Sequence, residues 1–175
     1  MKNSNKELEI VINYNFKNSN LLKQALIHKS YDNLDNNEKL EFLGDRVLGL
    51  IISKKLIEIY PEEKEGIIDK KFANLVNKKT CSSIANKLNI KKFMFLGPSH
   101  KSLQRSADKI MGDCLEALIG AIYLDGGIKS AEKFVLKPFR KDDESKAESM
   151  IKHGADALEN ILVRGLSHTM NHFNS

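Results

Sequence analysis

Carboxylates occur at helical spacing inside two otherwise apolar stretches of this 175-residue sequence. In EKLEFLGDRVLGL, Glu41 and Asp45 are four residues apart, and in DKIMGDCLEALIG, Asp113 and Glu116 are three apart. On a helix, these spacings place the two members of a pair within about 40° and about 60° of each other. Because the neighbouring residues favour burial, the charged groups would lose water and repel one another.

A divalent cation would relieve this repulsion. If the two helices pack together, the four carboxylates offer hard oxygen ligands at a density that favours Mg²⁺ or Mn²⁺. A single acidic pair is more often a solvated charged face. Two pairs, both in apolar settings, favour the metal interpretation, so we predict that the four acids converge on a metal site.

Apolar residues recur at three- and four-residue spacing along most of the chain, which predicts helices. A cap at Ser19 or Asn20 starts the second helix, Pro61 ends the third, and Gly126 and Gly127 end the sixth. The expected helices cover residues 5–14, 18–31, 37–60, 65–79, 80–90, 107–124 and 129–139. The sequence contains no alternating strand pattern and no internal repeat. It therefore predicts an all-α fold.

The composition, with 41% hydrophobic and 29% charged residues, is typical of a globular chain. The formal net charge of +5 fits a polyanionic partner such as nucleic acid, or simply lysine-rich usage. Cys81 and Cys114 lie far apart and lack metal-ligand spacing, which predicts reduced thiols rather than a disulfide or a zinc site. With no signal core and no membrane-length apolar run, we expect a cytoplasmic protein that does not enter membranes.

The run NEKLEFLGD, residues 37–45, resembles the signature of the ribonuclease III catalytic domain. The stretch DKIMGDCLEALIGAIYLDGG, residues 108–127, is similar to the second acidic helix of that family. ALIHKSY at 25–31, before the first of these stretches, and LVNKKT at 75–80, between the two, also match the pattern of the family. The resemblance covers roughly residues 8–137.

This resemblance implies an all-α homodimer that cleaves double-stranded RNA with Mg²⁺, or with Mn²⁺ in its place. The products would carry 5′-phosphate and 3′-hydroxyl ends. The family expectation for the role is RNA processing, and ribosomal precursor RNA is the expected substrate. By motif position, the implied metal ligands are Glu41, Asp45, Asp113 and Glu116. Among them, Asp45 and Glu116 are the implied catalytic residues.

Five further residues are weaker candidates for contacts with RNA or with a second subunit. Glu38 matches a family acid that lies nearer the RNA than the metal. His100, Lys101 and Arg105 belong to a basic loop that could contact the phosphate backbone, although such loops are often only solvated. Phe42 would fill a pocket on the partner subunit, and ordinary core packing is the alternative.

We expect residues 1–140 to form the catalytic domain and 141–175 to form a charged segment followed by a helical tail. The tail is too short, and lacks the strand pattern, for the double-stranded RNA-binding domain that usually follows in bacterial members. Two other functions stay open. One is an inactive RNA-binding member of the fold, and the other is an all-α, Mg²⁺-dependent nucleoside triphosphate pyrophosphohydrolase.

Overall fold

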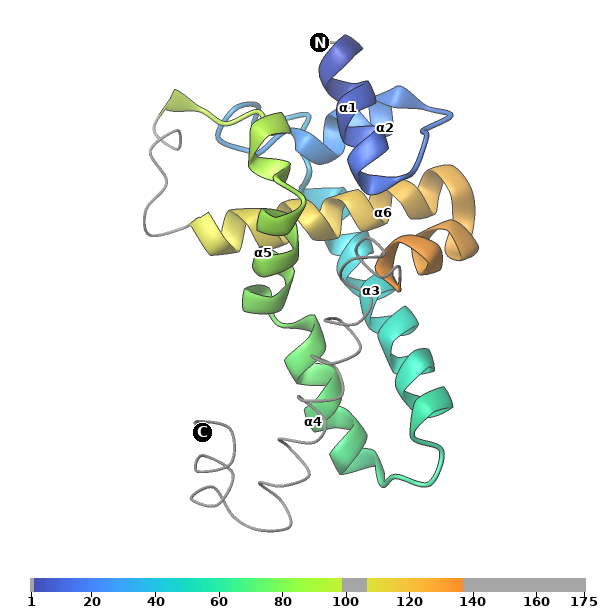
Figure 1. Cartoon of the computed structure of the whole chain (residues 1–175). Coiled ribbons are helices and arrows are strands. Elements are labelled where there is room, and N and C mark those ends of the chain that lie inside the picture. The colour runs from blue at the N-terminus through green and yellow to red at the C-terminus, as the bar shows by residue number, and fades with distance from the viewer. Residues whose placement is uncertain (1, 99–106, 137–175) are drawn as a thin grey trace, which may run out of the picture. The chain divides into compact units, whose positions relative to one another are not determined.

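Helices make up the regular structure of the described residues, 2–98 and 107–136, in this computed structural model, apart from one isolated bridge between Ile27 and Phe95 (Figure 1). In chain order they are α1 (Lys2–Ile12), α2 (Ser19–Leu26), α3 (Glu38–Ile59), α4 (Glu65–Val76), α5 (Lys78–Lys87), the 3₁₀ helix η1 (Ile90–Phe93) and α6 (Ala107–Val135). The all-α prediction is confirmed. The predicted tail over 141–175 lies outside the described residues.

The predicted second helix was wrong at both ends. Asn18, rather than Ser19 or Asn20, is the N-cap of α2, and its side chain accepts a hydrogen bond from the amide of Asn20. The helix ends at Leu26 instead of continuing to residue 31, because the backbone there pairs with Phe95. This long-range pairing overrides the local helical pattern.

The helix α3 makes its most extensive helix–helix contact with α6, and two glycines allow the backbones to touch. A Cβ atom on Gly44 would lie 1.7 Å from the carbonyl oxygen of Glu116, and one on Gly120 would lie 2.3 Å from the carbonyl oxygen of Leu40. No side chain fits at either position without moving a backbone. The start of α3 is therefore held directly against the middle of α6, which brings the two acidic stretches together.

Within α6, residues 110–122 are buried, with α2, α3 and α5 packed around them. This environment explains why that stretch is nearly continuously apolar, and it makes each of its charged residues costly. The predicted break after Leu124 occurs at Gly127, whose φ of 75° favours glycine. Helical structure then resumes and runs to Val135.

The second half of α3 lies beside α4, and the two extend away from α1 and α2 (Figure 1). No residue of α4, which lies wholly within the described part of the chain, is buried. Along one side of α3, three large apolar residues, Phe42, Leu50 and Ile57, are 65%, 62% and 59% exposed, and we call them the apolar stripe. Within the described residues, no helix has both the length and the apolar character to span a membrane.

Candidate metal centre

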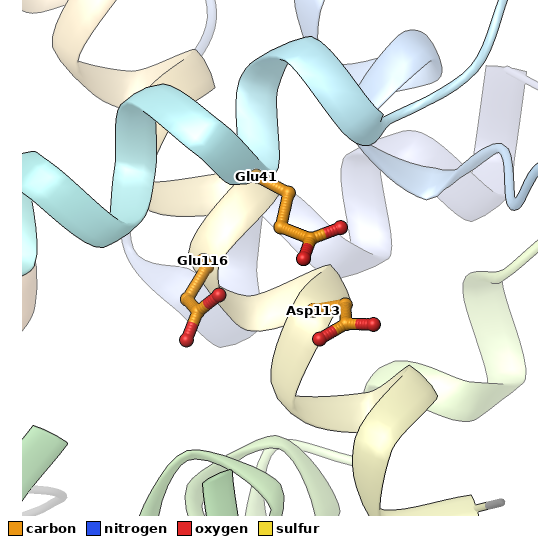
Figure 2. A group of neighbouring side chains, drawn as sticks. All are labelled: Glu41, Asp113 and Glu116. Carbon is orange, nitrogen blue, oxygen red and sulfur yellow. The ribbon is translucent and has the colours of Figure 1, made fainter. Parts of the chain in front are cut away.

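Three of the four predicted ligands meet where α3 crosses α6. Glu41 reaches from α3 towards Asp113 and Glu116 of α6, and we call these three residues the acid cluster (Figure 2). One carboxylate oxygen from each lies within 4.8 Å of the others. Side-chain exposure falls from 28% at Glu41 to 11% at Asp113 and 2% at Glu116, so the cluster opens to solvent on the Glu41 side.

The surroundings of the acid cluster disfavour its negative charge. Burial, followed by the charge of Asp113, raises the pKa of Glu41 above its ordinary value. Burial also raises the pKa of Glu116, and the charges of Asp45 and Asp113 add to this, although Lys78 opposes it. The cluster is therefore short of positive charge, which is the condition that a bound divalent cation corrects.

One cation from the chain itself lies in the cluster. The ammonium of Lys78 donates hydrogen bonds of 2.7 Å to Asp113 Oδ1 and 2.7 Å to Glu116 Oε2, and it lies 3.8 Å from Glu41 Oε1. Burial alone would lower the pKa of Lys78, but the hydrogen bonds and charges of Asp113 and Glu116 raise it above its ordinary value. The Lys78 side chain is still 48% exposed.

Sequence reasoning missed Lys78, although it falls within the LVNKKT match. Its partners are 35 and 38 residues away, so no local spacing reports the contact. The helix that carries it was expected to begin at Thr80, but Asn77 caps α5 by accepting a hydrogen bond from the Thr80 amide. This cap makes Lys78 the first residue of α5 and places its side chain beside α6.

Asp45, the fourth predicted ligand, is paired elsewhere. Its carboxylate accepts a hydrogen bond from Arg46, and its side chain is 45% exposed. The Arg46 guanidinium in turn lies 4.4 Å from the ring centre of Phe42. Asp45 is near enough for its charge to affect Glu116, but it is not one of the three converging carboxylates. Its role as a ligand stays a prediction.

A pocket beside the acid cluster carries both signs of charge. Lys29 and Lys109 line it together with Glu38, Glu41 and Asp113. Within it, the Lys29 ammonium donates a 2.8 Å hydrogen bond to Glu38, so this acid is outside the cluster. The pocket therefore places basic side chains next to the acid cluster, an arrangement that suits a phosphate group.

The other candidates have different outcomes. Phe42 is exposed, so core packing within its own chain is not its role. Cys81 and Cys114 are buried free thiols, as predicted, and burial raises the pKa of each, to about 11 and about 12. The three basic loop candidates, His100, Lys101 and Arg105, lie outside the described residues.

Comparison with known proteins agrees with this geometry. A family model described as Ribonuclease-III-like matches residues 18–142. Ribonuclease 3 of Pelagibacter ubique is 54% identical over 137 residues, covering 78% of this chain and 61% of the relative. Ribonuclease 3 of Campylobacter jejuni is 39% identical over 163 residues, covering 92% of this chain and 72% of the relative. The chain thus spans about 61% of the length of the Pelagibacter relative.

Solved structures give the same result. The nuclease domain of ribonuclease III from Campylobacter jejuni, in a study of flexibility in the region involved in dimer formation, superimposes with a TM-score of 0.73. It is 40% identical, and the match covers 77% of this chain and 95% of that domain. A second structure of this nuclease domain, 38% identical, also has a TM-score of 0.73. The chain belongs to the ribonuclease III family, and its described helices have the fold of that family's nuclease domain.

Proposed function

We propose that the chain is a metal-dependent endoribonuclease that hydrolyses double-stranded RNA and leaves 5′-phosphate and 3′-hydroxyl ends. The observation that carries this proposal is the acid cluster at the crossing of α3 and α6 in a chain of the ribonuclease III family. RNA processing is the proposed setting. The proposed compartment is the cytoplasm, where thiols such as Cys81 and Cys114 stay reduced.

The acid cluster fits Mg²⁺ or Mn²⁺. All three donors are carboxylate oxygens, which are the ligands that these hard cations prefer. Oxygens on opposite sides of a Mg²⁺ ion are about 4.2 Å apart, so a spread of up to 4.8 Å needs only small side-chain adjustments. Bound in the cluster, the cation would activate water and stabilise negative charge on the phosphate.

The burial of the three acids suggests a division of roles. Glu116 and Asp113, nearly enclosed by helices, provide oxygens whose positions the fold determines. Glu41 is the most open of the three, so we place the approach of the phosphate on its side. Asp45 is four residues after Glu41 on α3, and we propose it as the fourth acid. Its side chain would leave Arg46 and join the acid cluster when RNA binds.

Basic residues around the pocket would neutralise the RNA backbone. Lys29 and Lys109 line it beside the acid cluster, and both can approach phosphate oxygens. We propose that residues of the 99–106 segment, including Lys101 and Arg105, add phosphate contacts. Glu38 holds Lys29 in place and so lies near the proposed RNA path rather than at the metal.

We further propose a homodimer, in which each subunit cuts one RNA strand. The support is the apolar stripe of Phe42, Leu50 and Ile57, which a second copy would cover. In this scheme residues 1–140 are the catalytic domain, and 141–175 are a tail with a separate role.

The test is incubation of the purified chain with labelled long duplex RNA in Mg²⁺, with Glu116→Gln as the inactive variant. Glu132→Gln is the matched control, because Glu132 is also on α6 but pairs with Lys54 at 2.8 Å. We expect the wild type and the control to produce short duplexes with 5′-phosphates. An inactive RNA-binding protein would bind the duplex without cutting it in any metal, and a pyrophosphohydrolase would cleave nucleoside triphosphates instead.

A further inference from the structure

The ammonium of Lys78 occupies the place where the acid cluster would hold a cation. We infer that Lys78 is a built-in counter-ion that competes with the divalent metal for Asp113 and Glu116, and so determines how tightly the metal binds. This inference rests on the proposed metal site. It concerns a residue outside the two acidic stretches, and its effect is on metal affinity.

The competition follows from shared oxygens. Lys78 donates to Asp113 Oδ1 and Glu116 Oε2 at 2.7 Å each, and both carboxylates are proposed metal ligands. A Mg²⁺ ion about 2.1 Å from these oxygens would lie close to the ammonium, with no intervening water and strong repulsion. The metal and the ammonium therefore compete for the same two oxygens.

The charge balance explains why a metal still wins. One ammonium against three ionised carboxylates leaves the group at a formal charge of about −2, if all three acids are ionised. A dication in place of Lys78 leaves the three carboxylates at about −1 instead of about −2, whereas Lys78 keeps the carboxylates together when no metal is bound.

Lys78 is also placed so that it can leave. Its side chain is 48% exposed, so its ammonium can turn into solvent. The start of α5 does not depend on this side chain, because Asn77 provides the cap. A lysine at the N-terminus of a helix is unfavourable for the helix dipole, so its contact with the acids is what favours it here.

The test is the dissociation constant for Mn²⁺, measured on the full chain by electron paramagnetic resonance and by titration calorimetry, without RNA. Lys78→Met keeps the stem and removes the charge. Since the metal then no longer has to displace two charge-assisted hydrogen bonds, we expect Lys78→Met to bind Mn²⁺ at least about tenfold more tightly than the wild type. Lys78→Arg, which keeps a competing cation, should stay within about threefold of the wild type.

The control is Lys79→Met, which removes the neighbouring, exposed charge on the same helix. It should change the dissociation constant by less than about twofold, which separates direct competition from the general loss of positive charge. If Lys78→Met is unfolded in EDTA, the Mn²⁺ concentration that refolds it gives an upper limit on the dissociation constant of the folded variant, because binding then also drives folding.

The outcomes separate this inference from the proposed function. If the wild type binds Mn²⁺ at the acid cluster and Lys78→Met binds it equally or more weakly, Lys78 does not compete and the inference is wrong. If neither protein binds Mn²⁺ and Glu116→Gln changes nothing, the proposed metal site itself is wrong.

Discussion

The helix α3 carries two regions with opposite surroundings, the contact of Glu41 with α6 and the apolar stripe. Glu41 is 28% exposed and packs against two further acids of α6, while Phe42, Leu50 and Ile57 are 65%, 62% and 59% exposed. In the first region charges are removed from water, and in the second large apolar side chains are left in it. Both arrangements are unfavourable in an isolated chain.

The difference indicates two kinds of partner. Clustered carboxylates lose solvation and repel each other, so they are stabilised by a cation. Exposed apolar area is stabilised by another apolar surface, at about 25 cal/mol per Å² of area buried. One helix thus combines the proposed metal site with the proposed dimer surface, and the backbone contact at Gly44 is with α6, which carries the other two acids.

The largest expected effect is at the acid cluster. Replacing Glu116 by Gln removes a charged ligand while keeping its shape, and the metal contributes several kcal/mol of charge stabilisation. Because each 1.4 kcal/mol or so changes a rate tenfold, we expect duplex RNA cleavage to fall about 10³-fold. Single-turnover cleavage at saturating Mg²⁺ measures this, with Glu132→Gln as control. Wild-type turnover by Glu116→Gln would remove the acid cluster from the chemistry.

The next effect concerns the crossing of α3 and α6. Gly44→Ala places a Cβ atom 1.7 Å from a backbone oxygen, so we expect a loss in free energy of unfolding of about 3 kcal/mol or more. The matched control is Gly49→Ala, whose Cβ would contact the Phe72 ring at 3.5 Å. Alanine favours helix by about 0.5–1 kcal/mol, so this variant should match or exceed the wild type. Urea denaturation measures the free energy of unfolding of both variants. Equal values would mean that the backbones of α3 and α6 do not touch at Gly44.

A smaller effect tests the apolar stripe. We expect Phe42→Ala to weaken the homodimer by about 2 kcal/mol, or about thirtyfold in the dimer dissociation constant, because a central aromatic side chain is lost. The thermal stability of the monomer should hardly change, since Phe42 is 65% exposed. Sedimentation equilibrium measures association, with Leu34→Ala, at a position 95% exposed, as control. A wild type that stays monomeric at high concentration would exclude the proposed partner surface.

The smallest effect is the pH dependence of the metal-free protein. The pKa of Glu116 is raised above its ordinary 4.5, so its contribution to stability is complete below that pH and is lost as pH rises through the raised value. Gln cannot ionise, so Glu116→Gln should gain in melting temperature relative to the wild type between pH 4.5 and neutrality. Differential scanning calorimetry in EDTA follows this gain. A constant difference across that range would mean that the pKa of Glu116 is not raised.

The sequence was sufficient to predict the helical class and the meeting of the two acidic stretches. The spacing of two carboxylates determines whether they lie on the same face of a helix, and the apolar neighbours of Asp113 and Glu116 indicate that these two are buried. These are local properties, so a linear pattern contains them. The end of α2 at Leu26 was missed because the pairing with Phe95 comes from a distant part of the chain.

The remaining features of the site depend on side-chain contacts that the helical pattern does not specify. Lys78 reaches acids 35 and 38 residues away, which no spacing rule anticipates. Asp45 pairs with its neighbour Arg46 and not with the acid cluster, a choice that the four-residue spacing from Glu41 does not predict. The interior glycines Gly44 and Gly120 were a usable signal, because glycine weakens a helix unless another backbone approaches it closely.

The most direct test of the account is a crystal structure of the chain grown or soaked in Mn²⁺, with anomalous scattering measured at the manganese edge. We predict an anomalous peak that marks a Mn²⁺ ion bonded to Glu41, Asp113 and Glu116. The Lys78 ammonium should lie beyond hydrogen-bonding distance of Asp113 and Glu116. A structure with Mn²⁺ bound elsewhere, or with no peak and the Lys78 contacts of 2.7 Å intact at saturating Mn²⁺, would contradict the metal site.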